Sequence, residues 1–188
     1  MNTHPLQRFL KRILLVGLAA ASIGLLAGCS TPKVEQYAQE KPVLDLTQYF
    51  NGRLDAYGIF TDRSGAVVKR FTVVMDCQWS GNEGTLDEDF TYSDGSKQRR
   101  VWRLTRLGDG RFTGRADDVE GVAQGEVRGN AFHWTYTLNL PVDGRVVAVQ
   151  FDDWMYLIDE RVMLNRATMR KFGVTLGEVT LSFTRRSP

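Results

Sequence analysis

The chain has 188 residues, 43% of them hydrophobic, which is enough for one domain with a core but too few for two large ones. Its net charge is +2, and because residues 1–28 hold three basic residues and no acid, the other residues sum to −1. This nearly neutral body argues against a nucleic-acid partner, and two cysteines exclude a disulfide framework.

Residues 1–28 have the pattern of an export signal. Basic residues are followed by an uncharged, mostly apolar run of 16 residues (Ile13–Gly28), shorter than the about 20 that a membrane-spanning helix needs. The run leads into Leu26-Ala27-Gly28-Cys29, which resembles the lipobox of bacterial lipoproteins. The resemblance implies that the peptide is cut before Cys29, which then carries acyl chains such as palmitate. An ordinary signal peptide with a cysteine near its cut site is the alternative.

The lipobox resemblance also implies a location. Stable attachment needs more than one acyl chain, and a fully processed Cys29 would carry three. In many Gram-negative bacteria an aspartate after this cysteine retains the protein in the inner membrane, whereas this chain has Ser30. We therefore expect a lipid-anchored protein at the periplasmic face of the outer membrane. Residues 29–44 are polar and contain two prolines, which favours a tether, with the folded domain at residues 45–188.

From Gly52 onward, turn signals divide the chain into segments of about ten residues. The turns are rich in glycine and contain Asp-Gly pairs such as Asp94-Gly95 and Asp143-Gly144, which suit tight hairpins. The sequence shows no long helical pattern, and the one helix that we expect is a short one around Leu44–Phe50. Several segments alternate between apolar and polar residues, as strands with one buried face do; the clearest apolar sets are Phe71, Val73, Met75, Cys77 and Trp79; Phe132, Trp134, Tyr136, Leu138 and Leu140; and Val179, Leu181 and Phe183.

These segments predict an all-β domain, an antiparallel up-and-down, lipocalin-like barrel of about nine or ten strands. Parallel pairing is disfavoured because no segment supplies the crossover helices. A membrane-spanning barrel would also alternate, but with an apolar exterior and a polar lumen. The lipobox and the charges on both strand faces argue against that alternative.

Charged residues share strand faces with aromatic residues in several segments. In Phe151–Tyr156, Asp152 shares one strand face with Trp154 and Asp153 shares the other with Phe151, so whichever face points inward carries one aspartate among large apolar residues. Similar sets join Glu88 to Leu86 and Phe90, Arg100 to Trp102, Asn165 to Met163 and Arg166 to Leu164. Since a buried charge requires a partner, strands that line one cavity should bring the carboxylates of Glu88 and Asp152 to the guanidinium groups of Arg100 and Arg166.

We take this polar group as the candidate ligand-binding site. Its members would orient the polar end of a ligand in an apolar cavity; they are Glu88, Arg100, Trp102, Asp152, Trp154 and Arg166. Two structural alternatives, favoured together over the functional one, are an ion-pair network that plugs one end of the barrel and charges on the rim that do little.

No catalytic residue, metal site or cofactor is expected. Cys77 lies on an apolar face, which favours burial as a small hydrophobic residue. His133 is the only histidine after the signal, and one histidine with one buried cysteine makes no convincing zinc site. A serine-centred nucleophile motif before a helix is also missing from the sequence.

Four segments resemble an uncharacterised family of proteobacterial lipoproteins that is classed as a domain of unknown function. They are Gly84–Phe90, Gln98–Trp102, Phe151–Tyr156 and Asn165–Gly173. The resemblance covers about Leu46 to Arg185 and implies a small β-rich, lipocalin-like domain. It implies no activity and no catalytic residues.

Three functions follow as hypotheses. The first is an outer-membrane lipoprotein that binds a lipid or another hydrophobic small molecule in the barrel. The second is an interaction lipoprotein whose exterior docks an unknown envelope partner. The third, which we favour least, is an enzyme that acts on membrane lipids with Asp152 or Glu88 as a base.

Overall fold

The computed structural model describes residues 31–142 and 144–186, so the predictions for the signal peptide, Cys29 and Ser30 lie outside the described residues. The compact unit begins at Val34, not at residue 45 as predicted. Its elements, in chain order, are η1 (Val34–Tyr37), α2 (Leu46–Tyr49), β1 (Gly52–Asp62), β2 (Val67–Ser80), β3 (Glu83–Tyr92), β4 (Lys97–Gly108), β5 (Arg111–Arg115), β6 (Val119–Arg128), β7 (Ala131–Val142), β8 (Arg145–Leu157), β9 (Val162–Lys171) and β10 (Val174–Arg185).

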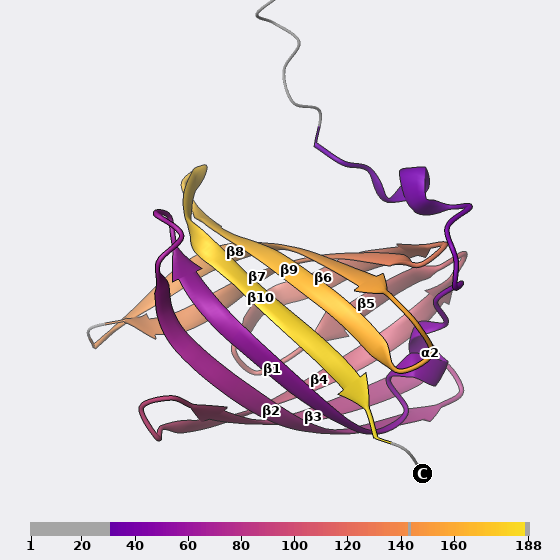
Figure 1. Cartoon of the computed structure of the whole chain (residues 1–188), viewed down its shortest axis with the longest axis horizontal. Coiled ribbons are helices and arrows are strands. Elements are labelled where there is room, and N and C mark those ends of the chain that lie inside the picture. Colours follow the sequence, from indigo (N-terminus) through magenta and orange to yellow (C-terminus); the bar gives the residue numbers. More distant parts are fainter. Residues whose placement is uncertain (1–30, 143, 187–188) are drawn as a thin grey trace, which may run out of the picture. The chain divides into compact units, whose positions relative to one another are not determined.

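The ten strands form one closed antiparallel barrel (Figure 1). Each strand pairs with its neighbours in the chain, and β1 closes the barrel by pairing with β10 from Leu54↔Arg185 to Asp62↔Gly177. The predicted up-and-down, lipocalin-like barrel is therefore confirmed, as is the expected strand number. Among the described residues, every strand pairing and the main core lie between Val34 and Arg186, so this segment contains the whole closed barrel.

Alternation along each strand separates an apolar interior from a charged exterior. On β2 the side chains of Phe71, Val73, Met75 and Cys77 are buried, and burial raises the pKa of the Cys77 thiol. The outer faces carry ion pairs such as Arg99–Asp87 on β4 and β3. An apolar lumen is the reverse of the polar lumen that the membrane-spanning alternative requires.

Aromatic rings fill the interior by lying directly against inward-facing glycines. A Cβ atom added to Gly125 on β6 would lie 2.3 Å from Cε3 of Trp134, its partner across the β6–β7 pair. The same holds for Gly58 on β1, where an added Cβ would lie 2.3 Å from Cζ of Phe71. These two glycines therefore serve close ring-to-backbone packing, not turn formation.

One end of the barrel, which we call the capped end, is covered by α2. Asp45 begins this helix by accepting hydrogen bonds from the backbone nitrogens of Thr47 and Gln48. Tyr49 and Phe50 are buried, and the Tyr49 hydroxyl donates to the carbonyl of Arg161 at 3.0 Å. The helix predicted within Leu44–Phe50 is thus present and shorter.

The opposite end, the uncapped end, carries the turns β1–β2, β3–β4, β5–β6, β7–β8 and β9–β10 (left in Figure 1). Among the described residues, neither of the two helices covers it. None of those helices has the length and apolar character required to cross a membrane.

The segment before α2 packs on the barrel, so the predicted tether is too long. Val34 and Tyr37 of η1 form a small cluster with Ala131, Trp154 and Tyr156 on the outer face of β7 and β8. Further along, the Leu44 nitrogen donates to the Gly129 carbonyl at 2.8 Å. The apolar residues within this polar stretch explain the difference, because Val34 and Leu44 are both buried.

Candidate functional site

The barrel encloses a cavity of about 140 Å³. Most of its wall is apolar, formed by side chains such as Val73, Phe151 and Val179. Tyr92 and Leu140, which lie near the strand ends at the uncapped end, also line it, so the cavity reaches toward that end. Its polar lining groups include Glu88, Arg100, Tyr136, Asp153 and Asn165.

Glu88 is a buried carboxyl in the middle of β3. It faces inward because it lies two residues from Leu86, which also faces the interior. Its Oε2 lies 4.0 Å from Nη1 of Arg100, its partner across the β3–β4 pair. Burial raises the pKa of Glu88 to about 7, and the nearby Arg100 charge offsets only part of that effect.

Arg100 is held from the other side by Asp118, in the turn between β5 and β6. Arg100 donates from Nε and Nη2 to Oδ2 of Asp118 at 2.9 and 2.8 Å. Gln98 donates to the same carboxylate at 3.3 Å and accepts from the Tyr92 hydroxyl at 2.8 Å. A chain of polar contacts therefore runs from the uncapped end to Glu88.

Asp153, on β8, is the second buried carboxyl of the cavity. It accepts a hydrogen bond from Nδ2 of Asn165, on the neighbouring strand β9, and a long one of 3.5 Å from the Tyr136 hydroxyl. Burial raises the pKa of Asp153 to about 7, although the Asn165 and Tyr136 bonds favour the ionised form. The cavity thus holds two carboxyl groups whose pKa values are both raised by burial.

The structure places three predicted site residues inside and three outside. Glu88, Arg100 and Trp102 face the interior, and their role in ligand binding stays a prediction. The expectation that Asp152 and Arg166 join Glu88 and Arg100 in one cavity is wrong, because β8 turns Asp153 inward and β9 turns Asn165 inward, so the residues next to them face outward. Arg166 pairs instead with Glu178 on the exterior, at 2.5 Å.

Trp154 belongs to the outer cluster under η1, and Asp152 lies beside it on the same outer face of β8. Asp152 accepts hydrogen bonds from Trp154 Nε1 at 3.1 Å and Arg170 Nη1 at 3.0 Å, and its Oδ1 lies 2.8 Å from His133 Nε2. Burial acts to raise the pKa of Asp152, but the contacts with His133 and Arg170 outweigh it and the pKa is lowered. The His133 ring stacks on Trp154 with 4.2 Å between centroids. The side chains around Asp152 therefore satisfy one another on the outer face of the barrel.

The polar residues at the cavity that were not among the predicted site residues include Asp153, Asn165 and Tyr136, which line it, and Asp118, which holds Arg100. Alternation along a strand does not show which face points inward. It therefore could not select Asp153 over Asp152 or Asn165 over Arg166. Tyr136 lies on a strand face that the sequence marks as apolar, so nothing in that pattern indicates a polar role for its hydroxyl group. Asp118 carries no signal, because it reaches Arg100 from a turn that only the folded barrel brings close.

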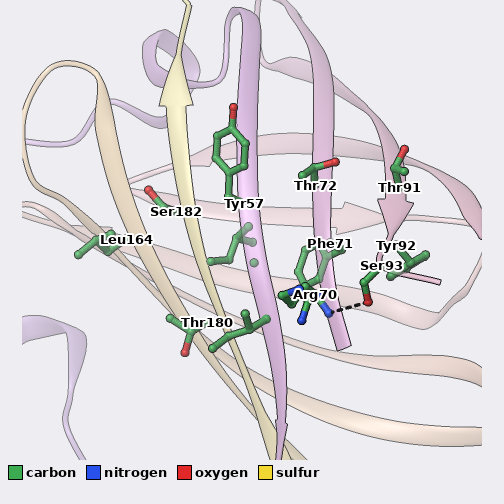
Figure 2. Close-up of a pocket in the computed structure, with 13 residues that line it drawn as sticks. Tyr57, Arg70, Phe71, Thr72, Thr91, Tyr92, Ser93, Leu164, Thr180 and Ser182 are labelled. Atoms are coloured by element: carbon green, nitrogen blue, oxygen red, sulfur yellow. Dashed lines mark hydrogen bonds between the residues drawn. The ribbon is translucent and has the colours of Figure 1, made fainter. Parts of the chain in front are cut away.

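A second hollow of about 710 Å³ lies on the outer face of β1, β2, β3, β9 and β10 (Figure 2). It is wide and open, and Figure 2 shows Tyr57 standing between the short side chains of Ser182 and Thr72, its partners across the strands. Its one charged side chain among the described residues that line it is Arg70, which is exposed. The inner cavity, with its buried charged groups, is the stronger candidate site.

Comparison of the sequence with known families gives a match. A sequence profile described as "Protein of unknown function (DUF3833)" matches residues 23–185. None of the curated proteins compared with the chain matches it.

Two solved structures share the barrel at low identity. An S-type phycobiliprotein lyase from Guillardia theta has a TM-score of 0.59 and 6% identity, covering 84% of this chain and all of that one. A protein of unknown function from the DUF3598 family of Nostoc punctiforme has a TM-score of 0.54 and 12% identity, covering 84% of this chain and 53% of that one. At these identities the likeness concerns the fold alone.

Proposed function

The chain belongs to the DUF3833 family, and we propose that it binds a small, mostly hydrophobic molecule inside the barrel, with a hydrogen-bond donor of that molecule directed at Glu88 and Asp153. One observation carries this proposal: two buried carboxyl groups face an apolar cavity. A site of apolar walls with a few placed polar groups is the usual composition of a small-molecule site.

The contacts of the two acids indicate what they would accept. Among the described residues, none donates a hydrogen bond to the Glu88 carboxyl, whose nearest charged group is Arg100 at 4.0 Å. Arg100 is directed mainly at Asp118. Since a carboxylate is a hydrogen-bond acceptor, an alcohol or amine suits this surface, whereas a fatty-acid carboxylate would meet two like groups.

The cavity limits the ligand's size. Its volume of about 140 Å³ is close to the ~150 Å³ of an apolar cavity that holds benzene, and is below the ~300 Å³ of ordinary ligand pockets. A ligand of about one aromatic ring fits without movement. The lipid of the first hypothesis would require the apolar walls to separate.

Calorimetry with single-ring probes tests the proposal. The chain from residue 30 onward, which contains the complete barrel, would be titrated with phenol, benzylamine, benzene and benzoate. We expect phenol and benzylamine to bind more tightly than benzene, and benzoate not to bind. Failure of all four probes to bind would contradict the proposal and indicate a structural core.

A matched pair of variants locates the site. Glu88→Leu removes an inner carboxyl and should lower the affinity for benzylamine by about tenfold to a hundredfold, because a charge-assisted hydrogen bond contributes about 1.5–3 kcal/mol. Asp152→Leu removes an outer carboxyl and should leave that affinity unchanged. Equal effects of the two variants would place binding elsewhere.

We also propose that Cys29 is lipidated and holds the barrel at the periplasmic face of the outer membrane. The support is the Leu26-Ala27-Gly28-Cys29 motif and Ser30, read from the sequence alone. Expression of the full chain in a Gram-negative bacterium, followed by mass spectrometry, should show cleavage before Cys29 and three acyl chains. A Cys29→Ala variant should lack that mass increase, and an unmodified mature wild type would overturn the proposal.

A further inference from the structure

Exposed apolar side chains gather on three hairpins at the uncapped end. Six of the thirteen exposed large hydrophobic residues among the described part of the chain lie in, or within two residues of, the turns of the β1–β2, β7–β8 and β9–β10 hairpins. The six strands concerned follow one another around the barrel, from β7 through β10 and β1 to β2. We call these residues the apolar rim; they are Val67, Val68, Val142, Val146, Phe172 and Val174.

Phe172 is the most conspicuous member of the apolar rim. It is 90% exposed at the tip of the β9–β10 hairpin, with φ at +51°. Bulky residues are uncommon in this left-handed region, and such tight turns prefer Asn or Asp before Gly. The Phe172 ring has one nearby cation, Lys171 Nζ at 5.0 Å from its centroid. Internal packing therefore does not explain a strained, exposed aromatic residue here.

Basic residues accompany the apolar rim. The segments 62–70, 142–147 and 170–174 hold six basic and two acidic residues, a net charge of +4 in a chain whose total is +2. Some of these cations have partners, such as Lys69 with Asp94 at 2.9 Å and Arg170 with Asp152. Arg63 and Lys171 lie at the turns themselves, beside the exposed apolar residues.

From this arrangement we infer that the uncapped end docks on an anionic lipid bilayer. The apolar rim would enter the interface, while Arg63 and Lys171 would contact lipid phosphates. A bilayer suits the geometry better than a protein does, because the rim is spread over the turns of three different hairpins and has basic residues beside it. A stable protein interface needs about 800 Å² of continuous complementary surface on each partner.

Docking would bring the end toward which the inner cavity extends against the lipid. The inference goes beyond the proposed ligand binding and does not depend on it, since an empty or a filled barrel could dock in the same way. A Glu88→Leu variant, which alters the cavity, should dock as the wild type does. That variant separates failure of this inference from failure of the ligand proposal.

Co-sedimentation with vesicles tests the inference, using the chain from residue 30 onward so that the apolar run of the signal is absent. We expect binding to vesicles that contain about one third phosphatidylglycerol in phosphatidylcholine, and at least tenfold weaker binding to phosphatidylcholine alone. The double variant Phe172→Asn/Val174→Ser should reduce the affinity for the anionic vesicles at least tenfold, because it removes two apolar side chains from the interface. Asn tolerates the left-handed backbone at position 172, so the fold should survive.

Leu107→Ser/Ile158→Ser is the matched control. These residues are 53% and 51% exposed and lie at turns of the capped end, so this variant should bind as the wild type does. Wild-type binding by the rim variant, or no binding to either vesicle, would overturn the inference. Self-association in analytical ultracentrifugation that the rim variant abolishes would also overturn it, in favour of contact between protein chains.

Discussion

The two ends of this barrel differ in what their side chains do. At the capped end Leu46, Tyr49 and Phe50 are buried, and the Tyr49 hydroxyl ties α2 to the backbone of Arg161 and Phe183. At the uncapped end the turns expose apolar residues, and polar contacts lead inward to the buried Glu88. The difference indicates that stability is concentrated at one end, which leaves the other end available for binding.

The largest expected effect on stability comes from removing a buried ring at the capped end. The Phe50 ring is 3% exposed and packs edge-on against Tyr49 and Phe183, with centroids 5.1 and 5.4 Å apart. Phe50→Ala should lower the free energy of unfolding by about 3–5 kcal/mol, measured by urea denaturation.

The same change at the uncapped end is the control. Phe172→Ala removes an exposed ring and should change the free energy of unfolding by less than about 0.5 kcal/mol, since surface substitutions away from such contacts are nearly neutral. Similar losses in the two variants would show that both ends support the fold equally, and the comparison would fail.

The second effect is the pH dependence of stability, which should come from the cavity. The pKa values of Glu88 and Asp153 are raised to about 7 in the folded chain, above the ~4 of exposed carboxyl groups. Between about pH 4 and 7 the unfolded chain therefore binds fewer protons than the folded one, so stability falls as the pH rises through this window.

Each acid should contribute on the order of 3 kcal/mol to this fall, which urea denaturation at pH 5 and pH 8 measures. Glu88→Gln and Asp153→Asn should each flatten the profile, whereas Asp152→Asn should not, because its pKa is lowered and it titrates below the window. Stability that rises from pH 5 to pH 8 would contradict the burial of these acids.

The third effect compares two glycines. Gly129 has φ at +53°, and an added Cβ would lie 1.8 Å from the Tyr37 carbonyl oxygen, where η1 meets the barrel. Gly173 has φ at +78° and open space around it. Gly173→Ala should cost about 1–2 kcal/mol through backbone strain alone. Gly129→Ala should lower the free energy of unfolding by more than Gly173→Ala does, because backbone atoms must move, and it should expose η1 to proteolysis. Equal losses in the two variants would mean that the packing of η1 on the barrel adds nothing to stability.

The alternation of residues predicted the barrel but left the direction of two strands open. A two-residue period tells which side chains share a face, and both orientations of Phe151–Tyr156 place one aspartate among aromatic residues. The choice of Asp153 depends on its hydrogen bond with Asn165 on the neighbouring strand β9, which local sequence does not contain. Similarly, nothing local indicates that Asp118 reaches Arg100, or that Val34 finds a place against Trp154.

The smallest expected effect concerns the wall between the two ends. Arg166, predicted as a site residue, forms an exterior ion pair with Glu178, and its side chain is 66% exposed. Arg166→Ala should change the free energy of unfolding by at most about 0.5 kcal/mol and leave benzylamine affinity unchanged, because exposed pairs are screened by solvent. Calorimetry and urea denaturation of this one variant check both. A loss of benzylamine affinity would show that the outer face of β9 affects the cavity. Binding would then depend on the barrel wall as well as on the uncapped end.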